Sequence, residues 1–336
     1  MKAVVQTIYG PPSVLTLKEV ETPIPKDNEI QIKIYSTTVN TGDIWARNFR
    51  KISPFEFSMP FIFWLPAKFV FGIRKPRTKI LGSEFAGEIN AIGKDVTLFK
   101  KGDHVFGYRG QNFGGNAEYL CMPENGIVSI KPDNMTFEQA ASIPYGSLTA
   151  LNILRKVNIK KGDKVLINGA SGSIGNFAVQ FSKYYGAEVT GVCSTTKMGY
   201  VAALGADNVI DYTKEDFTKN GESYDIILDI MNKSSYSHCK GSLTQNGTYV
   251  LASFKMRQIF QMLRTKIIGS KKVLCALSME TPEDLVHIRE LVEKGSIKSI
   301  IDKEYPIEEL VAAHEYVEKG LKKGHVVIII KSNSDQ

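Results

Sequence analysis

Residues 164–175, KVLINGASGSIG, run from an apolar segment into a turn that carries three glycines. Val165 to Ile167 is typical of a buried strand, and the residues after the turn have helical spacing. Glycines permit a sharp turn and a close backbone approach, and the first turn of a helix presents N–H groups to an anion. The pattern predicts a turn that binds the pyrophosphate of a dinucleotide, with contacts from Gly169, Ala170, Ser171, Gly172, Ser173, Ile174 and Gly175. A glycine turn without a ligand is the competing interpretation, which the flanking pattern disfavours.

The sequence around the turn alternates strand and helix. A helical pattern from Ile174 to Tyr185 ends at Gly186, and a second strand candidate follows directly at 187–192. Further apolar strand candidates lie at 208–210, 225–230, 247–252 and 272–277. This alternation predicts an α/β fold with a Rossmann-type, doubly wound parallel sheet. The ligand of such a sheet lies across the carboxyl ends of the strands, here Asn168, Ser194, Asp211, Ile230 and Ser253.

The end of the second strand indicates which dinucleotide binds. Residues 193–197 read CSTTK, without a carboxylate. An acidic residue at this place would bond the ribose hydroxyls of NAD and repel a phosphate, whereas hydroxyl groups and a cation suit the extra phosphate of NADP. Ser194, Thr195 and Lys197 therefore predict NADPH as the cofactor, although a solvated loop lysine is an alternative interpretation of Lys197.

Composition bounds the class of protein. The chain has 336 residues, 43% of them hydrophobic and 23% charged, which suits a globular protein of two domains. Its 42 basic and 35 acidic residues give a net charge of +7, but the basic residues are scattered, so we expect no nucleic-acid partner. The four cysteines show neither disulfide nor metal spacing, and strand-like sequence begins directly after Met1, so we expect a cytoplasmic protein.

The first 125 residues differ in texture from the rest. Short alternating strand patterns such as 30–35 are separated by turns such as 101–103, which predicts a β-rich module. A helix near 282–294 and a strand at 325–331 have no place in the six-stranded sheet, so we expect them to return to the first domain. The predicted organisation is a catalytic domain at 1–125, an NADP-binding domain at 126–278, and a C-terminal return at 279–336.

Short motifs in a fixed order carry a resemblance to a known family. They are VNTGD at 39–43, LGSEFAGEI at 81–89, KGDHVFG at 101–107, GGNAEY at 114–119 and GHVVI at 324–328. With the glycine turn, they resemble the medium-chain dehydrogenases/reductases, and within them the zinc-independent quinone oxidoreductases, over nearly the whole chain. The resemblance implies a chaperonin-10-like (GroES-like) β-rich first domain, a cofactor cleft beside the nucleotide domain, and a homodimer.

The resemblance also allows a prediction of whether the chain binds zinc. Metal-dependent relatives have cysteine where Asn40 stands and histidine where Ser83 stands, and neither an amide nor a hydroxyl is a good zinc ligand. Their structural zinc uses four cysteines in a loop that here, at 108–115, contains none. The five histidines show no paired ligand spacing, so we expect no metal site.

The remaining site residues follow from the resemblance. Asn40 and Asp43 are expected to line the nicotinamide end of the cleft as catalytic residues. Cofactor contacts are also implied for Thr149, Tyr212 at the adenosine, Ser253 at the nicotinamide, and His325 on the C-terminal strand. The alternative is structural: Asn40 caps a turn, and Asp43 is the N-cap of a helix that starts at Ile44.

An aromatic run from Phe55 to Phe71 departs from the compact quinone reductases. Prolines at 54, 60 and 66 exclude an ordinary membrane-spanning helix. The favoured interpretation is a lid or wall of an apolar substrate pocket, followed by packing at a domain or subunit interface. The least favoured is a peripheral membrane contact, aided by Arg47, Arg50, Lys51, Arg74, Lys75 and Arg77.

These observations predict an oxidoreductase that transfers hydride from NADPH to a quinone or an α,β-unsaturated carbonyl without zinc. Such acceptors delocalise the charge they receive, so orientation and hydrogen-bond donors suffice. We expect a small-molecule electron acceptor as partner, and a homodimer that pairs an edge strand near 273–276. The alternatives are a non-catalytic NADPH-binding sensor or docking protein and, less favoured, a zinc alcohol dehydrogenase.

Overall fold

A computed structural model describes residues 1–54, 56–57 and 59–330 of the chain. By its internal contacts the chain divides into two compact units. Unit 1 comprises Met1–Ser53, Leu65–Tyr145 and Thr281–Gln336, and unit 2 comprises Pro54–Trp64 and Gly146–Glu280.

Unit 2 is built on a sheet of six parallel strands. The strands are β8 (Lys164–Asn168), β9 (Glu188–Cys193), β10 (Asn208–Asp211), β11 (Tyr224–Asp229), β12 (Leu243–Leu251) and β13 (Lys272–Cys275). Their order across the sheet is β10-β9-β8-β11-β12-β13, and every neighbouring pair is parallel. This is the order of a doubly wound dinucleotide-binding sheet, so the predicted Rossmann fold is confirmed.

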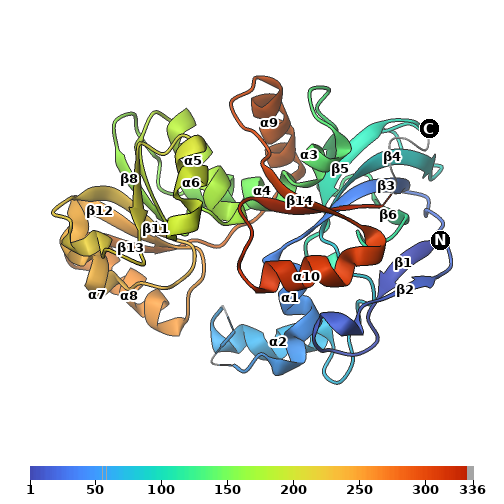
Figure 1. Cartoon of the computed structure of the whole chain (residues 1–336), viewed down its shortest axis with the longest axis horizontal. Helices are drawn as coiled ribbons and strands as arrows, with labels where there is room; N and C mark the ends of the chain where they lie inside the picture. The colour runs from blue at the N-terminus through green and yellow to red at the C-terminus, as the bar shows by residue number, and fades with distance from the viewer. Residues whose placement is uncertain (55, 58, 331–336) are drawn as a thin grey trace. The chain divides into compact units, whose positions relative to one another are not determined.

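Helices cover both faces of this sheet. They are α5 (Ser173–Tyr184), α6 (Met198–Ala203), α7 (Tyr236–Cys239) and α8 (Met256–Ile267), with α5 and α6 on one face and α7 and α8 on the other (Figure 1). Val165, Leu166 and Ile167 in the central strand are fully buried, because a strand between two helical layers has no solvent-facing side.

Unit 1 contains a seven-stranded mixed sheet and a two-stranded ribbon. The sheet follows the order β14-β15-β3-β4-β5-β7, with β6 also paired to β3. Its strands are β3 (Glu29–Val39), β4 (Glu84–Ile92), β5 (His104–Tyr108), β6 (Tyr119–Pro123), β7 (Val128–Ile130), β14 (Ile301–Pro306) and β15 (His325–Ile329). The ribbon is β1 (Lys2–Val5) with β2 (Thr16–Glu19). β15 pairs antiparallel with β3, Val326 opposite Val39, and thereby joins segments from the two ends of the chain.

The helices of unit 1 lie around this sheet. They are α1 (Thr41–Asn48), α3 (Phe137–Ala141), α9 (Pro282–Glu293) and α10 (Leu310–Glu318); α2 (Trp64–Phe71) and α4 (Pro144–Arg155) begin in one unit and continue in the other. Short 3-10 helices are η1 (Pro12–Val14), η2 (Phe49–Lys51), η3 (Phe61–Phe63), η4 (Gly110–Asn112), η5 (Thr195–Lys197), η6 (Phe217–Lys219), η7 (Lys240–Ser242) and η8 (Ile307–Glu309).

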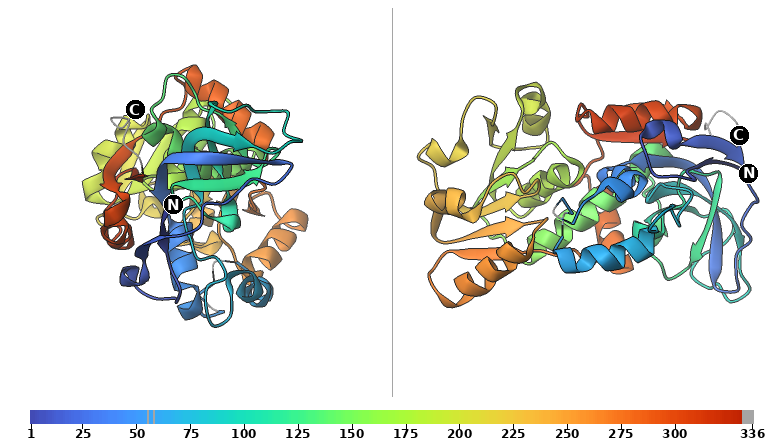
Figure 2. Two further views of the ribbon diagram at one scale, coloured as in Figure 1. Left: turned by 90° about the vertical axis from the view of Figure 1, so that its right-hand side faces the viewer. Right: turned by 90° about the horizontal axis from the view of Figure 1, so that it is seen from below.

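Helices α1 and α10 lie side by side (Figures 1 and 2), and a buried arginine of α1 bonds to side chains of α10. Arg47 is fully buried. The distance between its Nη1 atom and Nδ1 of His314 is 2.7 Å. The guanidinium also pairs with Glu318 and donates from Nε to the Gly10 carbonyl at 3.1 Å. The least favoured interpretation, a membrane contact, included Arg47 among its cations; the structure contradicts it at this residue, because the Arg47 guanidinium is buried and paired inside unit 1.

The aromatic run forms η3 and α2, and its members Phe55 and Ser58 lie outside the described residues. Large apolar side chains of this run are exposed, namely Phe61, Ile62, Phe63, Leu65, Phe69 and Val70. The end of α2 is fixed, since the Tyr9 hydroxyl donates to the Phe71 carbonyl at 2.6 Å and the Phe71 ring stacks on Phe49. Within the described part of the chain, every helix falls short of the length and apolar character needed to cross a bilayer.

Candidate functional site

The glycine turn has the geometry that a phosphate-binding loop requires. Gly169 adopts a φ of 97°, a left-handed conformation that favours glycine. A Cβ atom on Gly175 would lie 2.1 Å from the Gly169 carbonyl oxygen, so only glycine permits helix α5 to pack this closely on the turn. At Gly172 an added Cβ would lie 3.5 Å from its nearest atom, the Gly169 carbonyl oxygen, which is an ordinary van der Waals distance, so packing does not require glycine here.

The N-terminus of α5 follows directly from this turn. Its N-cap residue is Gly172, which has no side chain to cap the first N–H groups. Ala170 is buried beneath the turn and donates its N–H to the Val192 carbonyl, whereas Ser171 and Ile174 remain partly exposed. An uncapped helix N-terminus at the carboxyl edge of a parallel sheet is a favourable place for a pyrophosphate.

Thr149 lies on a helix that packs against this same place. A Cβ atom on Gly146, in α4, would lie 2.5 Å from the Ser173 carbonyl oxygen. Thr149 is half-buried and one turn further along α4, so it shares a face with Gly146. Within unit 2, the predicted contact Thr149 therefore lies on the helix face turned to the start of α5.

The end of β9 carries the residues predicted to select the cofactor. Ser194 is half-buried, and Thr195 to Lys197 form η5, whose Lys197 N–H donates to the Ser194 carbonyl. An acidic residue, Asp211, reaches this place from the neighbouring strand β10 and accepts a hydrogen bond from the Thr195 hydroxyl. Tyr212 follows it and is exposed.

Local partners occupy the Asp211 carboxylate. Thr213 donates to it from its N–H at 3.0 Å and its hydroxyl at 2.7 Å, and the Lys214 ammonium lies 3.8 Å away. The hydrogen bond from Thr195, followed by those from Thr213, lowers the pKa of Asp211, so this group is a carboxylate at neutral pH. The sequence pattern predicts Asp211 at the sheet edge but does not predict its contact with Thr195.

A second buried carboxylate, Asp229, organises the loop after β11. It accepts hydrogen bonds from Asn168 Nδ2 at 3.2 Å, from the Tyr249 hydroxyl at 2.7 Å and from the Ser234 N–H at 3.0 Å. The loop passes over the glycine turn, since a Cβ atom on Gly169 would meet Met231 Cγ at 2.9 Å and Ile230 Cβ at 3.7 Å. Ile230 is thus brought to the turn, and Met231 is a neighbour that sequence analysis missed. Ser253, predicted at the nicotinamide, is half-buried just beyond β12.

Asn40 has two structural partners at the start of α1 in unit 1. Its Oδ1 accepts from the Gly42 N–H at 2.8 Å and the Asp43 N–H at 3.3 Å, so Asn40 is the N-cap of this helix. Asp43 completes a capping box by accepting the Asn40 N–H at 3.0 Å. The alternative in which Asp43 is the N-cap is therefore wrong, because the helix begins at Thr41.

The amide nitrogen of Asn40 faces a buried polar cluster. Asn40 Nδ2 donates to Ser83 Oγ at 2.8 Å and to Glu84 Oε2 at 3.3 Å. Glu84 also accepts from the Thr38 hydroxyl, and its Oε1 accepts the Tyr145 N–H at 2.8 Å. Asn40 and Glu84 are at most 2% exposed, so this cluster is a fixed, dry arrangement in which Asn40 is the central donor.

The carboxyls of this cluster hold protons more tightly than usual. Burial raises the pKa of Asp43 to about 7, and the N–H groups of Asn40 and Gly82, the latter 2.9 Å from Oδ1, limit the rise. Burial likewise raises the pKa of Glu84, while the charge of Lys322 lowers the pKa of both carboxyls. Lys322 is half-buried beside β15, and sequence analysis missed it and the role of Glu84.

His325 begins strand β15 and is buried. Burial lowers the pKa of its imidazole to about 3, and the charge of Lys322 acts in the same direction. The ring is therefore neutral at physiological pH and does not serve as a cation toward a phosphate.

The donor set at the metal positions does not suit zinc. The two residues that replace the zinc ligands of the resembled enzymes, Asn40 and Ser83, contact each other through an amide and a hydroxyl, which are poor zinc ligands. Among residues 1–54, 56–57 and 59–330, no group of three or more His, Cys, Asp or Glu side chains is arranged to hold a metal.

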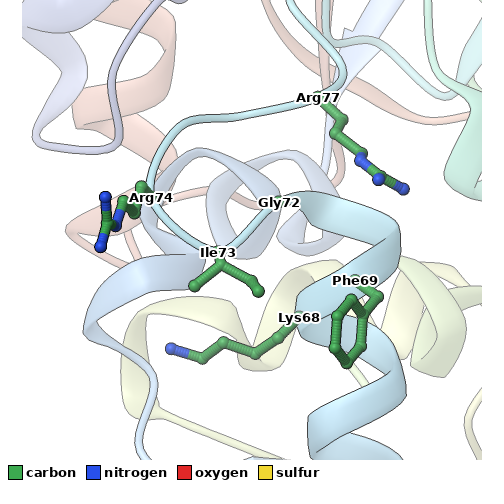
Figure 3. A pocket seen from close by; sticks show the side chains of 6 residues that line it. All are labelled: Lys68, Phe69, Gly72, Ile73, Arg74 and Arg77. Atoms are coloured by element: carbon green, nitrogen blue, oxygen red, sulfur yellow. The ribbon is translucent and has the colours of Figure 1, made fainter.

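A separate shallow pocket of about 410 Å³ lies beside α2 in unit 1 (Figure 3). Its lining is Lys68, Phe69, Gly72, Ile73, Arg74 and Arg77, none of which belongs to the predicted cofactor or catalytic residues. The side chains of Arg74 and Arg77 point to opposite sides in this view, so they do not converge on a single anion (Figure 3).

Comparison with known proteins gives consistent matches. Residues 26–132 match the sequence profile of the alcohol dehydrogenase GroES-like domain, and residues 204–328 match that of a zinc-binding dehydrogenase family. The chain is 32% identical over 328 residues to the mitochondrial NAD(P)H oxidoreductase RTN4IP1 of Mus musculus. The aligned region covers 90% of this chain and 81% of that protein. It is 30% identical over 342 residues to the chloroplastic quinone-oxidoreductase QR1 of Triphysaria versicolor, covering 98% of each.

Solved structures agree with these matches. The quinone oxidoreductase from Coxiella burnetii superimposes with a TM-score of 0.84 and 27% identity, over 98% of this chain and 99% of that chain. The GroES-like assignment of the β-rich part of unit 1 is thereby confirmed, together with the Rossmann sheet of unit 2.

Proposed function

Because the chain belongs to the quinone oxidoreductase family of the medium-chain dehydrogenases/reductases, and is an NAD(P)H-dependent oxidoreductase, we propose that it reduces a quinone or an α,β-unsaturated carbonyl with NADPH and without zinc. Two observations carry the proposal: the intact glycine turn of unit 2, and in unit 1 a contact between the Asn40 amide and the Ser83 hydroxyl, which are poor zinc ligands.

Unit 2 holds the cofactor in this proposal. The pyrophosphate binds at Gly172 to Gly175, where the uncapped start of α5 supplies N–H donors. Ser194, Thr195 and Lys197 contact the extra phosphate of NADPH, and the Lys214 ammonium, 3.8 Å from the Asp211 carboxylate, reduces the repulsion between that carboxylate and the phosphate. Thr149, Tyr212, Ile230, Ser253 and His325 are assigned to the remainder of the cofactor.

Unit 1 orients the acceptor. When bound, NADPH supplies a hydride from its nicotinamide. Asn40 is assigned a positioning role at the acceptor end of the site, because its buried carboxamide holds Ser83 and Glu84 in place. Asp43 uses both carboxylate oxygens on backbone N–H groups, so we assign it a positioning role that holds Asn40 and Gly82. The charge of half-buried Lys322, which acts on Asp43 and Glu84, is assigned to the stabilisation of negative charge on the acceptor.

The proposal also includes the boundaries of the two functional regions, the oligomeric state and the cellular compartment. We assign cofactor binding to 126–278, of which 126–145 belong to unit 1, and acceptor binding to 1–125 with 279–336. The edge strand β13 is assigned to homodimer pairing, because it ends the parallel sheet of unit 2. Four free cysteines, Cys121, Cys193, Cys239 and Cys275, suit a reducing compartment such as the cytoplasm.

The competing function is a non-catalytic NADPH-binding sensor. It differs from the enzyme in one measurable respect, which is turnover. NADPH oxidation by the purified chain across a panel of quinones, alkenals and enones supports the enzyme, whereas tight NADPH binding without oxidation across the whole panel supports the sensor.

Two variants test the site. Asn40→Ala is expected to lower kcat about 10- to 100-fold, in the range for loss of an orienting donor. Because this change also removes a helix cap, Thr136→Ala at the N-cap of α3 is the matched control, and it should leave kcat unchanged. Equal losses in both variants would assign the effect to folding.

The cofactor assignment has its own test. Lys197→Ala is expected to raise the KM for NADPH about tenfold, the worth of one charged contact, and to leave the KM for NADH unchanged. Lys219→Ala, which removes an exposed cation of unit 2 that is assigned no cofactor contact, is the control. A wild-type preference for NADH over NADPH would overturn the assignment.

Zinc independence is tested by chelation. Prolonged dialysis against EDTA is expected to leave NADPH oxidation unchanged, because an amide and a hydroxyl occupy the ligand positions. A stoichiometric zinc ion in the purified protein, with activity lost on its removal, contradicts the proposal.

A further inference from the structure

Helix α8 of unit 2 exposes a continuous apolar stripe. Phe260, Leu263 and Ile267 are spaced by three and four residues, which places them on one face of the helix. Their exposures are 64%, 51% and 83%, and Ile268 just beyond the helix is 65% exposed. So many large apolar side chains on one short helix are unusual for a surface that only contacts water.

The opposite face explains why the stripe stays outside. Ile259 and Met262 pack against the core of unit 2, and Thr265 is buried. The Thr265 hydroxyl accepts the Val273 N–H at 3.0 Å, and the Cys275 N–H lies 3.4 Å from Met262 Sδ. Because these contacts fix α8 on β13, the stripe is held in place as a rigid surface.

The charged side chains of α8 and of the chain on either side of it have a single sign. The sequence contains no aspartate or glutamate between Asp229 and Glu280, a span that includes eight lysines and arginines. Arg257, Arg264 and Lys266 belong to α8 and are exposed, and none of them forms an ion pair with a carboxylate of the described chain. Helix α8 therefore exposes cations together with its apolar stripe.

The combination of exposed apolar side chains and cations favours one binding partner of α8 over another. In a two-fold contact of α8 with a second copy, the same patch would face itself and bring Arg257, Arg264 and Lys266 against like charges. An anionic bilayer instead takes the apolar stripe into its acyl boundary and places phosphate groups beside the cations. A helix with a polar cationic face and an exposed apolar face lies in the plane of such an interface.

We propose that α8 is a docking surface for anionic lipid membranes, on which the chain binds peripherally through Phe260, Leu263 and Ile267 with support from Arg257, Arg264 and Lys266. The proposal concerns binding alone, so its failure and that of the proposed oxidoreductase activity are independent.

Vesicle co-sedimentation of the full chain tests the surface. We expect binding to vesicles of equal parts phosphatidylglycerol and phosphatidylcholine, and at least about tenfold weaker binding to phosphatidylcholine alone or in about 0.5 M salt. The triple variants Phe260→Ser/Leu263→Ser/Ile267→Ser and Arg257→Gln/Arg264→Gln/Lys266→Gln should each reduce binding about tenfold or more. The double variant Leu98→Ser/Lys101→Gln, which removes an exposed leucine and an exposed lysine of unit 1, is the control and should bind as the wild type does.

A second measurement avoids dependence on the fold of the triple variants. Phe260→Trp keeps an aromatic side chain on the stripe, and its emission should shift to the blue and be quenched by brominated lipid when anionic vesicles are added. The chain contains two other tryptophans, so Leu98→Trp serves as the matched background. Equal binding to neutral and anionic vesicles overturns the proposal. So does an apolar triple variant that becomes monomeric while it retains vesicle binding, which would assign the stripe to self-association.

Discussion

At the scale of single residues, Arg47 shows how a charge is accommodated in the interior of unit 1. Its guanidinium contacts the Glu318 carboxylate, the His314 ring and the Gly10 carbonyl, so each of its three nitrogens has a partner although the side chain is fully buried. A charge of this kind is stable only while its partners remain, because each partner removed leaves a buried group uncompensated.

Arg47→Met is therefore expected to lower the free energy of unfolding by about 3 kcal/mol, as for other broken buried pairs. Urea denaturation measures the change. Arg50→Met, three residues along and exposed, is the control and should shift the free energy by less than about 0.5 kcal/mol. Similar losses in the two variants would mean that the buried contacts add no stability.

His314 makes unit 1 sensitive to acid. Burial, helped by the charge of Arg47, lowers the pKa of its imidazole to about 3, below the 6.5 of an unfolded histidine. Above pH 6.5 both states are neutral and the stabilisation is complete, and as the pH falls toward 3 the unfolded state gains the proton first, so stability is lost.

The wild type should therefore lose about 3 kcal/mol more than His314→Gln between pH 7 and pH 4, at about 1.4 kcal/mol per pH unit below 6.5. Glutamine keeps an acceptor for Arg47 but does not titrate. His325 titrates in both proteins and cancels in the comparison. Parallel stability profiles for the two proteins would contradict the assignment.

At the scale of elements, the glycine turn contains one glycine that packing requires and one that is assigned to ligand binding. Gly175→Ala places a Cβ 2.1 Å from the Gly169 carbonyl oxygen and should destabilise unit 2 by about 3 kcal/mol, because backbone must move. Gly172→Ala meets its nearest atom at 3.5 Å and has a φ of −81°, so it should fold normally and weaken NADPH binding by crowding the pyrophosphate. Thermal melts and NADPH titration measure the two effects; normal NADPH affinity in Gly172→Ala would remove the turn from the site.

The same elements show what sequence could predict. The strands of unit 2 were predictable because burial on both faces leaves apolar runs such as Val165 to Ile167, and the glycine turn has a local signature. The approach of Asp211 to Thr195 was not, since it joins two strands whose register no local pattern gives. Strand β14 also escaped prediction, because its exposed charged residues lack a clean alternation.

Contacts across long separations were the least predictable part of the candidate site. The motif at 81–89 and the one at 39–43 were both visible in the sequence, but the bond between Asn40 and Ser83 depends on how β3 and β4 are registered. Lys322 lies in a polar loop whose sequence resembles ordinary surface. Its influence on Asp43 and Glu84 emerges only when residues far apart in the chain are brought together.

At the scale of the whole molecule, the division into two units predicts how the cofactor stabilises the chain. Calorimetry should resolve two transitions, and NADPH at about a hundred times its Kd should stabilise the unit that binds it by about 2.7 kcal/mol. NADH at the same concentration is the control and should shift that transition less. A single transition moved equally by both nucleotides would contradict independent units and a preference for NADPH.

The pairing of β15 with β3 has a consequence for biosynthesis. A ribosome finishes β3 nearly three hundred residues before it makes the partner that covers residues 36–39 of that strand. Until then the growing chain carries an open sheet edge, the kind of surface to which chaperones and neighbouring nascent chains bind. Unit 2, whose sheet is made from one continuous stretch, can fold on the ribosome in the meantime, so nascent-chain proteolysis should find it protected while unit 1 is still cleaved.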